Sequence, residues 1–355
     1  MKMKNLMKLQ ALLLMLIISS AMILVSCSRE DEIVQGDKTE LTALITEADA
    51  LAAAATTTDF PQSAIDTYKS VLATVKTAAA TKLTQAEIDN LVAQLTAAMN
   101  TFKAAEYGFI DESLYLNAGW HFDEGTGTTA TAFSTVKHVG TFTKGNAGVF
   151  GAEALLPTWT TGVKGGYAVS LNKGANLQVP YTTSFLPANL SISVWIKPVE
   201  LYENNYILSQ NYWTGYKLQT QGGGKPFFTY KKVDGGIIDA DNETDNSITA
   251  NVWNHVVITL DGTTKELKFY VNGTLTKTWT EANKTIGPLI QTLTSPAPQP
   301  FIIGCVATDT ELATWSWTET PTSLGYFKGA IDELKIYNIA IAAGQVSKLY
   351  NDEKP

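Results

Sequence analysis

Short runs of apolar residues, many with a period of two, fill the chain after residue 112. Such alternation places the apolar side chains on one face of a β-strand. Gly, Asn, Asp and Pro separate the runs, which is typical of turns between strands. The clearest runs are 168–171, 191–196, 216–220, 227–231, 255–260 and 331–336. About 240 residues organised in this way predict one all-β domain, a two-sheet sandwich over residues 113–352.

The best-defined hairpin is predicted at residues 267–279. Asn272-Gly273 provides the positive φ angles that a two-residue type I′ turn requires. Apolar residues of the strand before this turn fall on one face, which is expected to meet the core. These residues are Leu267, Phe269 and Val271.

Continuous pairing away from this turn decides which side chains share the other face of the hairpin. It places Tyr270 opposite Leu275 and Lys268 opposite Lys277, on the face that points away from the core. Trp279 lies on that same face. The hairpin is therefore expected to present Tyr270 and Trp279 outward.

Residues 37–106 differ in composition, being rich in Ala, Thr, Leu and Lys, and their apolar positions recur at helical spacing. A third helix start is indicated near Pro61, in addition to two capping boxes, because Pro is tolerated in a first helical turn. The capping-box pairs are Asp37 with Glu40 and Thr84 with Glu87. The segment predicts three antiparallel helices of about 16–20 residues in a small bundle that serves as a spacer, with 107–112 as the linker to the sandwich.

The N-terminus has the composition of a secretory signal. Lysines precede a mostly apolar run at 9–25. The run ends in Leu24-Val25-Ser26-Cys27, which resembles the bacterial lipobox and implies removal of residues 1–26 and acylation of Cys27. The alternative is a transmembrane anchor, but a run of about 17 residues lies at the lower limit for spanning a bilayer.

An acidic tether is predicted at residues 27–36. It contains Ser28-Arg29-Glu30-Asp31-Glu32, which resembles the surface-export signal of Bacteroidota lipoproteins. Residue 28 is not the aspartate that commonly retains lipoproteins in the inner membrane. This resemblance implies a lipid-anchored protein of the outer membrane that is exposed on the cell surface. A merely solvated tether has the same composition and remains an alternative.

Several motifs of the sandwich segment follow one another in the order found in a known family. They are G-W-H-F-D-E-G-T-G-T-T-A from residue 119, W-T-T-G-V-K-G-G-Y-A-V-S-L from 159, L-S-I-S-V-W-I-K-P from 190, N-V-W-N-H-V-V-I-T-L-D-G from 251, L-K-F-Y-V-N-G from 267, P-F-I-I-G from 300 and F-K-G-A-I-D-E-L-K-I-Y-N from 327. In this order they resemble the laminin-G-like, concanavalin-A-like lectin/glucanase jelly roll, over about residues 113–352.

This resemblance implies a jelly-roll sandwich, and domains of that kind commonly bind sugars. The helical segment at 37–106 loosely resembles the FIVAR-type three-helix modules of bacterial cell-surface proteins. The predicted fold class is therefore a small all-α bundle followed by an all-β jelly roll. A shared fold does not fix a ligand, so the function has to be argued from the residues.

Charge and cysteine content narrow the choice of partners. The net charge of −8 excludes nucleic acid and anionic lipid as main partners, because both require basic patches. A neutral polysaccharide is more compatible with this charge. Cys27 is used by the lipid in this interpretation, so Cys305 has no disulfide partner within the chain and is expected to be a small buried apolar residue.

The acidic residues do not form the pattern of a glucanase, in which alternate positions of one strand bring two carboxylates onto one face. Asp332 and Glu333 are adjacent and therefore face opposite ways. The acids at 239–245 lie in a polar loop and lack the glycine of an EF-hand. His255 lies in an apolar strand and is expected to be structural. We therefore expect no catalytic residues.

Calcium is the only cofactor that the sequence suggests. The first and last strands of this sandwich type lie side by side, which would bring Asp123 or Glu124 near Asp332. Carboxylate oxygens together with loop carbonyls suit Ca²⁺. The alternative is that these carboxylates accept hydrogen bonds from the backbone at strand ends, and the sequence favours this alternative because the ligand count is not visible in it.

Aromatic side chains flanked by amides are what a sugar-binding site requires, because sugar rings present flat C–H faces. Three groups of such residues are candidates for carbohydrate binding. The first lies in a long polar loop, where functional residues are common, the second lies among asparagines and glutamines, and the third is on the outward face of the hairpin. The groups are Trp315 with Trp317, Tyr212 with Trp213, and Tyr270 with Trp279.

These patterns together predict a surface lipoprotein whose helical spacer presents a polysaccharide-binding sandwich and which serves a glycan-uptake system. The main alternative is an adhesive or structural protein that binds a partner protein through the same aromatics. A glycoside hydrolase would need carboxylates assembled from separate strands.

Overall fold

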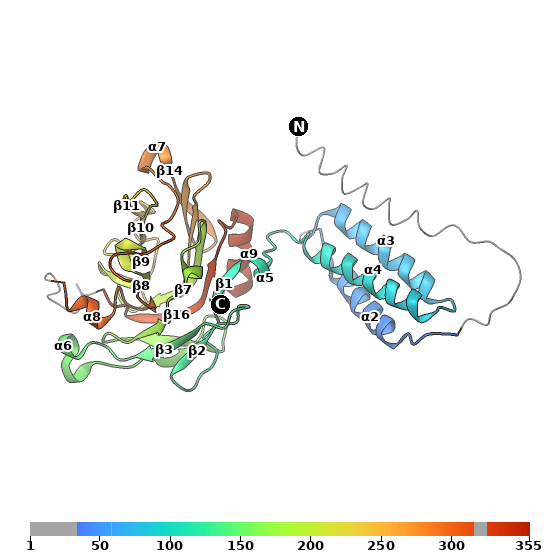
Figure 1. The fold of residues 1–355 in the computed structure, drawn as a ribbon, viewed down its shortest axis with the longest axis horizontal. Coiled ribbons are helices and arrows are strands. Elements are labelled where there is room, and N and C mark those ends of the chain that lie inside the picture. The colour runs from blue at the N-terminus through green and yellow to red at the C-terminus, as the bar shows by residue number, and fades with distance from the viewer. Residues whose placement is uncertain (1–33, 58, 316–324) are drawn as a thin grey trace, which may run out of the picture. The chain divides into compact units, whose positions relative to one another are not determined.

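The computed structural model describes residues 34–57, 59–315 and 325–355. The described residues form two compact units: one contains residues 34–54 and Asp66–Met99, and the other contains Ala55–Ile65 and the described part of Asn100–Pro355. The predicted order of a helical region followed by an antiparallel β-sandwich is confirmed (Figure 1). Among the residues described here, no helix is both long enough and apolar enough to span a bilayer.

The helical region consists of α2 (Thr39–Ala54), α3 (Gln62–Ala79) and α4 (Gln85–Lys103). The capping box at the start of α4 is confirmed, since the Thr84 N–H donates to the Glu87 carboxylate at 2.8 Å and the Glu87 N–H returns a longer bond of 3.4 Å to Thr84 Oγ1. At α2 the Asp37 carboxylate instead accepts from the Thr39 N–H at 2.8 Å, and the Asp37 N–H donates to Gln85 Oε1 at 3.0 Å rather than to Glu40. Buried residues at helical spacing form the core of this unit: Leu41, Ala48, Tyr68, Leu72, Val75, Ile88, Leu95 and Met99.

Sheet A forms one layer of the sandwich. Its strand order is β14 (Thr274–Thr280), β13 (Glu266–Val271), β12 (Asn254–Asp261), β7 (Leu190–Pro198), β16 (Gly329–Tyr337), β5 (Tyr167–Leu171) and β4 (Thr158–Thr161), and β1 (Leu116–Trp120) also pairs with β16. The first and last strands are therefore neighbours, as predicted.

Sheet B forms the other layer. Its strand order is β11 (Ile237–Asp241), β10 (Lys225–Lys231), β9 (Tyr216–Gln221), β8 (Asn205–Gln210), β15 (Phe301–Ile303), β6 (Asn176–Val179), β3 (Val139–Thr143) and β2 (Thr129–Thr131). The short helix α5 (Glu112–Tyr115) precedes β1, and three more short helices lie between strands: α6 (Ala147–Phe150), α7 (Glu281–Lys284) and α8 (Asp309–Leu312). Helix α9 (Ala343–Glu353) follows the last strand.

The core lies between the two sheets and is built from alternate residues of their strands. Phe301 of sheet B is at its centre, with its ring centroid 4.7 Å from that of Phe185 and 6.2 Å from that of Trp120. Cys305 is buried, as predicted. Because every second residue points inward, the remaining positions of each strand form an outer face, and these outer faces carry the chemistry described below.

The β13–β14 hairpin departs from its predicted register beyond the first two pairs. Tyr270 lies opposite Leu275 as predicted, but a β-bulge follows, so that Lys277 lies opposite Phe269 rather than Lys268. A bulge inserts one extra residue into a strand, so each later side chain of that strand points to the opposite face of the sheet from the one predicted. Trp279 consequently turns toward the core, is 9 % exposed, and donates its indole N–H to the Asp241 carbonyl at 2.7 Å. The predicted outward position of Trp279 is wrong.

Tyr270 does point away from the sandwich core, but it is not exposed. Its side chain is 2 % exposed because a second apolar cluster covers this part of the outer face of sheet A. Helix α9 contributes Val346 to that cluster, and β1 contributes Leu116. Tyr270 and Trp279 are therefore not exposed on an outward face of the hairpin, which was the reason that the sequence offered for ligand binding there.

Candidate functional site

Three aromatic side chains from two distant segments meet at the outer face of sheet B. The ring centroid of Trp315 lies 4.9 Å from that of Trp213 and 5.1 Å from that of Tyr212, and the latter two lie 4.5 Å apart. The sequence placed these residues in two separate groups. Trp317, the other predicted member, lies outside the described residues. We refer to Tyr212, Trp213 and Trp315 as the aromatic cluster.

Local geometry fixes the position of the cluster. The chain leaves β8 through Asn211, whose φ of 53° is left-handed, and forms a tight 3₁₀ turn at Tyr212–Thr214. The Tyr212 N–H donates to Ser209 Oγ at 2.8 Å, and its phenolic O–H donates to Glu311 of α8 at 2.6 Å. Tyr212 is buried, whereas Trp213 and Trp315 are only half-buried. The two tryptophans are thus held in place and remain partly accessible.

Beside the cluster, side chains form two transverse rows across the outer face of strands β8 to β11. Backbone pairing fixes these rows, because residues opposite each other in neighbouring strands share a face. The first row is Tyr206, Gln219, Phe227 and Asp241, and the second is Ser209, Lys217, Thr229 and Asp239. We call these eight residues the polar rows. They combine aromatic rings with amide, hydroxyl, ammonium and carboxylate groups, which are the groups that bind sugar hydroxyls and C–H faces.

Lys217 is the least expected member of the polar rows. It is 6 % exposed, and its Nζ lies 5.0 Å from the ring centroids of both Tyr206 and Phe227. Burial lowers the pKa of Lys217 to about 8, with a smaller opposing effect of Asp239. Sequence reasoning predicted both strands, at 216–220 and 227–231, but did not consider their outer face. The signal that would have identified Lys217 was its position between the apolar residues Tyr216 and Leu218, which places it on the opposite, outer face of the strand.

The carboxylates that the sequence linked to calcium bond to the backbone instead. Asp123 accepts from the Tyr167 N–H at 2.8 Å, and Glu124 accepts from the Thr131 N–H at 2.7 Å. Both oxygens of Asp332 are used, by the N–H groups of Val163 at 2.8 Å and Glu333 at 2.9 Å. Within the described ranges, no group of three or more acidic, His or Cys side chains is arranged to hold a metal ion. These contacts are the backbone hydrogen bonds that the sequence analysis gave as the alternative to calcium binding.

Calcium removal tests this interpretation. Because the oxygens of Asp332 are occupied by backbone donors, we expect EDTA and added CaCl₂ to leave the melting temperature of the full chain unchanged. Differential scanning calorimetry measures this. A calcium-dependent rise in melting temperature that is lost in Asp332→Asn would show that these carboxylates do bind the ion.

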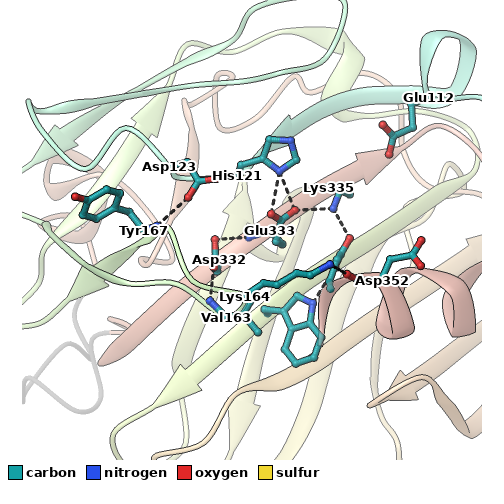
Figure 2. A network of polar contacts seen from close by, with 12 residues as sticks. Glu112, His121, Asp123, Val163, Lys164, Tyr167, Asp332, Glu333, Lys335 and Asp352 are labelled. Carbon is teal, nitrogen blue, oxygen red and sulfur yellow. Dashed lines mark hydrogen bonds and ion pairs between the residues drawn. The ribbon is translucent and has the colours of Figure 1, made fainter. Parts of the chain in front are cut away.

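A second polar centre lies on the outer face of sheet A, and sequence reasoning missed it (Figure 2). Lys335 of β16 bonds Glu333 at 2.7 Å and also bonds Glu353 of α9. Glu333 in turn contacts His121 Nδ1 at 2.9 Å, and the Trp195 indole donates to Glu353 at 2.8 Å. The group adjoins a cleft of about 440 Å³, which Glu112, Phe133, Lys164, Leu349 and Asp352 also line. We call Lys335, Glu333 and Glu353 the buried ion triad.

The triad is best explained as a structural device. Lys335 is 4 % exposed and bonds both carboxylates, so its charge is compensated on two sides. Burial would lower the pKa of Lys335, but Glu353 and Glu333 together raise it. Burial likewise opposes ionisation of Glu333, yet the bonds from His121 and Lys335 hold its pKa below the usual value. Burial raises the pKa of Glu353, although its bonds with Lys335 and Trp195 oppose that change. The bonds of Lys335 connect α9 to sheet A.

His255 lies in the interior of β12 and is fully buried. Its Nε2 lies 2.8 Å from Ser193 Oγ, and its ring stacks on Trp195 with centroids 5.0 Å apart. Burial lowers the pKa of His255 to about 3, so the ring is neutral. These contacts agree with the structural role that the sequence predicted.

Comparison with known proteins concerns the sandwich. No curated protein matches the chain significantly. Among solved structures, domain 4 of AbnA, an extracellular arabinanase from Geobacillus stearothermophilus solved with arabinotriose, is 21 % identical, with 67 % of this chain and 100 % of that chain covered and a TM-score of 0.46. The binding domain of botulinum neurotoxin DC, solved with SialylT, is 14 % identical, with 69 % and 52 % covered and a TM-score of 0.46.

The binding domain of Paraclostridial Mosquitocidal Protein 1 is 18 % identical, with 67 % of this chain and 52 % of that chain covered and a TM-score of 0.41. The chain thus spans about half the length of these two toxin domains. At such identities and TM-scores, the likenesses do not indicate what the present chain binds. A family model gives firmer information: residues 171–347 match the family described as the concanavalin A-like lectin/glucanases superfamily, and the β-sandwich has a concanavalin A-like fold.

Proposed function

We propose that the sandwich binds a glycan at the outer face of sheet B and does not cleave it. The observation that carries this proposal is the continuity of the aromatic cluster with the polar rows. Tyr206 belongs to the polar rows and also to the apolar cluster against which Trp213 and Trp315 pack. Aromatic platforms beside amides and carboxylates match the alternating C–H faces and hydroxyls of sugars.

A glycan array tests this proposal. The full chain, purified in detergent and fluorescently labelled, is applied to an array of plant, host and microbial polysaccharides. We expect binding to a restricted set of related glycans. Failure to bind any glycan, while the protein remains folded by circular dichroism, would refute the proposed function.

The absence of catalysis is part of the proposal. Glu333 and Glu353, a described pair of carboxylates that lie close to one ammonium group, are both bonded by Lys335, so neither is free to act as a nucleophile or as an acid/base. We expect no release of reducing sugar from any glycan that the protein binds, as measured by a reducing-end assay over several hours. Turnover that disappears in Glu333→Gln would contradict the binding-module assignment.

The same proposal places the protein at the cell surface. Its basis is the lipobox-like end of the signal at Cys27 and the acidic run at residues 30–32, which both lie outside the described residues. In this view Cys27 carries the lipid in the outer membrane of a member of the Bacteroidota, the FIVAR-like helices α2 to α4 act as a spacer, and the captured glycan is passed to an uptake system.

Cys27→Ala tests the anchor. Without the thiol no acylation follows, so we expect the variant to lose metabolic labelling with palmitate and to remain unprocessed or be released. Cys305→Ala is the matched control, because that thiol is buried in the sandwich. Unchanged fractionation of Cys27→Ala with outer membranes would refute the lipoprotein assignment, and protease shaving of intact cells tests surface exposure separately.

A further inference from the structure

Lys217 and Lys335 are both buried lysines of this sandwich, but only one of them has a counter-ion. Lys335 is 4 % exposed and bonds two carboxylates. Lys217 is 6 % exposed, and its one hydrogen bond is the donation from Nζ to the neutral Gln219 Oε1 at 2.5 Å. Among the described residues, no carboxylate lies within ion-pair distance of Lys217.

The acidic residues on the same face are engaged elsewhere. Asp239, directly across β10, accepts a bond from Thr229 Oγ1 at 2.5 Å. Asp241 pairs with Lys225 at 3.5 Å. Removal of a charged ammonium from water is costly unless an opposite charge compensates it. The rings of Tyr206 and Phe227 compensate only in part, because cation–π contacts are weaker than a desolvated ion pair.

An unpaired buried cation inside a proposed binding surface indicates that the ligand supplies an anionic group. We propose that the outer face of sheet B recognises an acidic sugar and that Lys217 pairs with the sugar's carboxylate. This inference rests on the proposed glycan-binding function and specifies its ligand class. The carboxylate approaches from the side of Phe227, which is half-buried, and Asp239, which is exposed. The sugar ring then lies against Phe227, the partly exposed aromatic ring of the polar rows.

The charge of the surroundings limits the ligand to few acidic groups. Asp239 and Asp241 lie on the same face, and the whole chain carries a net charge of −8. A densely charged polyanion would be repelled by these groups. The site therefore fits a glycan with an isolated acidic residue, such as a single uronic or sialic acid on a neutral chain. This proposal differs from the wholly neutral ligand that the net charge alone favours.

Protonation of Lys217 gives the pairing a characteristic pH dependence. Since burial lowers the pKa of Lys217 to about 8, the free site loses its positive charge as pH rises through that value. A bound carboxylate favours the charged form and raises the pKa, so binding takes up protons near pH 8 and weakens above it. The other ionisable groups on this face are Asp239 and Asp241 of β11, Lys225 and Lys231 of β10 and the phenol of Tyr206, and Glu311 of α8 lies at its edge.

Paired glycans test the inference. Oligosaccharides that carry one uronic or sialic acid are printed beside their carboxyl-reduced counterparts, together with a poly-glutamate peptide, and titrated with the full chain in detergent. We expect the acidic forms to bind about tenfold or more tightly than the reduced forms, because a hydrogen bond to a charged group contributes that much. Calorimetry at pH 8 in two buffers of different ionisation enthalpy should show proton uptake.

Lys217→Met should abolish this preference and the proton uptake, so that an acidic glycan binds the variant no more tightly than its carboxyl-reduced counterpart does. The melting temperature of Lys217→Met should equal or exceed that of the wild type, since the variant removes an unpaired buried charge. Lys231→Met removes the same charge from the same face and should retain the preference.

The outcomes distinguish failure of the proposed glycan binding from failure of the proposed preference for an acidic sugar. If wild-type protein binds no glycan, the proposed function and this inference both fail. If it binds neutral and acidic forms equally, or if Lys217→Met keeps the preference, only the inference fails. Equal binding of poly-glutamate would also overturn it, because the site would then recognise carboxylates without recognising sugar.

Discussion

Replacement of Lys335 by methionine should lower the free energy of unfolding of the sandwich by about 3–5 kcal/mol, the usual cost of removing one partner from a buried ion pair. Glu333 and Glu353 would then remain buried without their shared cation. The contact between β16 and α9 would weaken, because Lys335 of β16 bonds Glu353 of α9. The effect exceeds that of an ordinary surface substitution by several-fold.

Chemical denaturation measures this effect selectively. All eight tryptophans of the chain lie between residues 120 and 317, so their fluorescence reports the β-sandwich and not the helices α2 to α4. Lys265→Met is the matched control, because its pair with Glu281 is solvent-exposed and should contribute about 0–1 kcal/mol. A loss below about 1 kcal/mol in Lys335→Met would show that the triad contributes little to stability.

Replacement of Trp213 and Trp315 together by alanine should weaken glycan binding by about 100-fold. Buried aromatic contacts of a binding site commonly contribute 2 kcal/mol or more each, and neighbouring contributions do not add fully. Both side chains are half-buried in the free protein, so their removal should cost less stability than the about 3–5 kcal/mol of a core tryptophan. Calorimetric titration with a glycan identified on the array measures the affinity, and thermal melting measures the stability.

Tyr167→Ala is the control for this double variant. Tyr167 is 47 % exposed and lies on β5 of sheet A, so its loss should not affect a site on sheet B. Normal binding by the double variant would move the site away from the aromatic cluster. Loss of folding would show that the two rings belong to the apolar core around Tyr206 and Ile302.

The proposed glycan site combines parts that the sequence indicated with parts that it did not. Tyr212, Trp213 and Trp315 were recognised individually, because aromatic residues in polar loops are visible in one dimension. Their contact was not visible, since 99 residues separate Tyr212 from Glu311, whose carboxylate holds it beside α8. The unpaired state of Lys217 was equally hidden, because it depends on the partners that Asp239 and Asp241 take on neighbouring strands.

The sequence by itself determined the elements of this protein and their order. Period-two patterns predicted the strands, helical spacing predicted α2 to α4, and Asn272-Gly273 predicted the turn and the first pairs of its hairpin, because these features depend on local sterics and short-range hydrogen bonds. Only the tertiary structure decided which outer faces stay accessible. One bulge after Tyr270 turned Trp279 inward, and the cluster that includes Val346 of α9 covered Tyr270. Burial depends on what packs from elsewhere in the chain, and no local pattern encodes that.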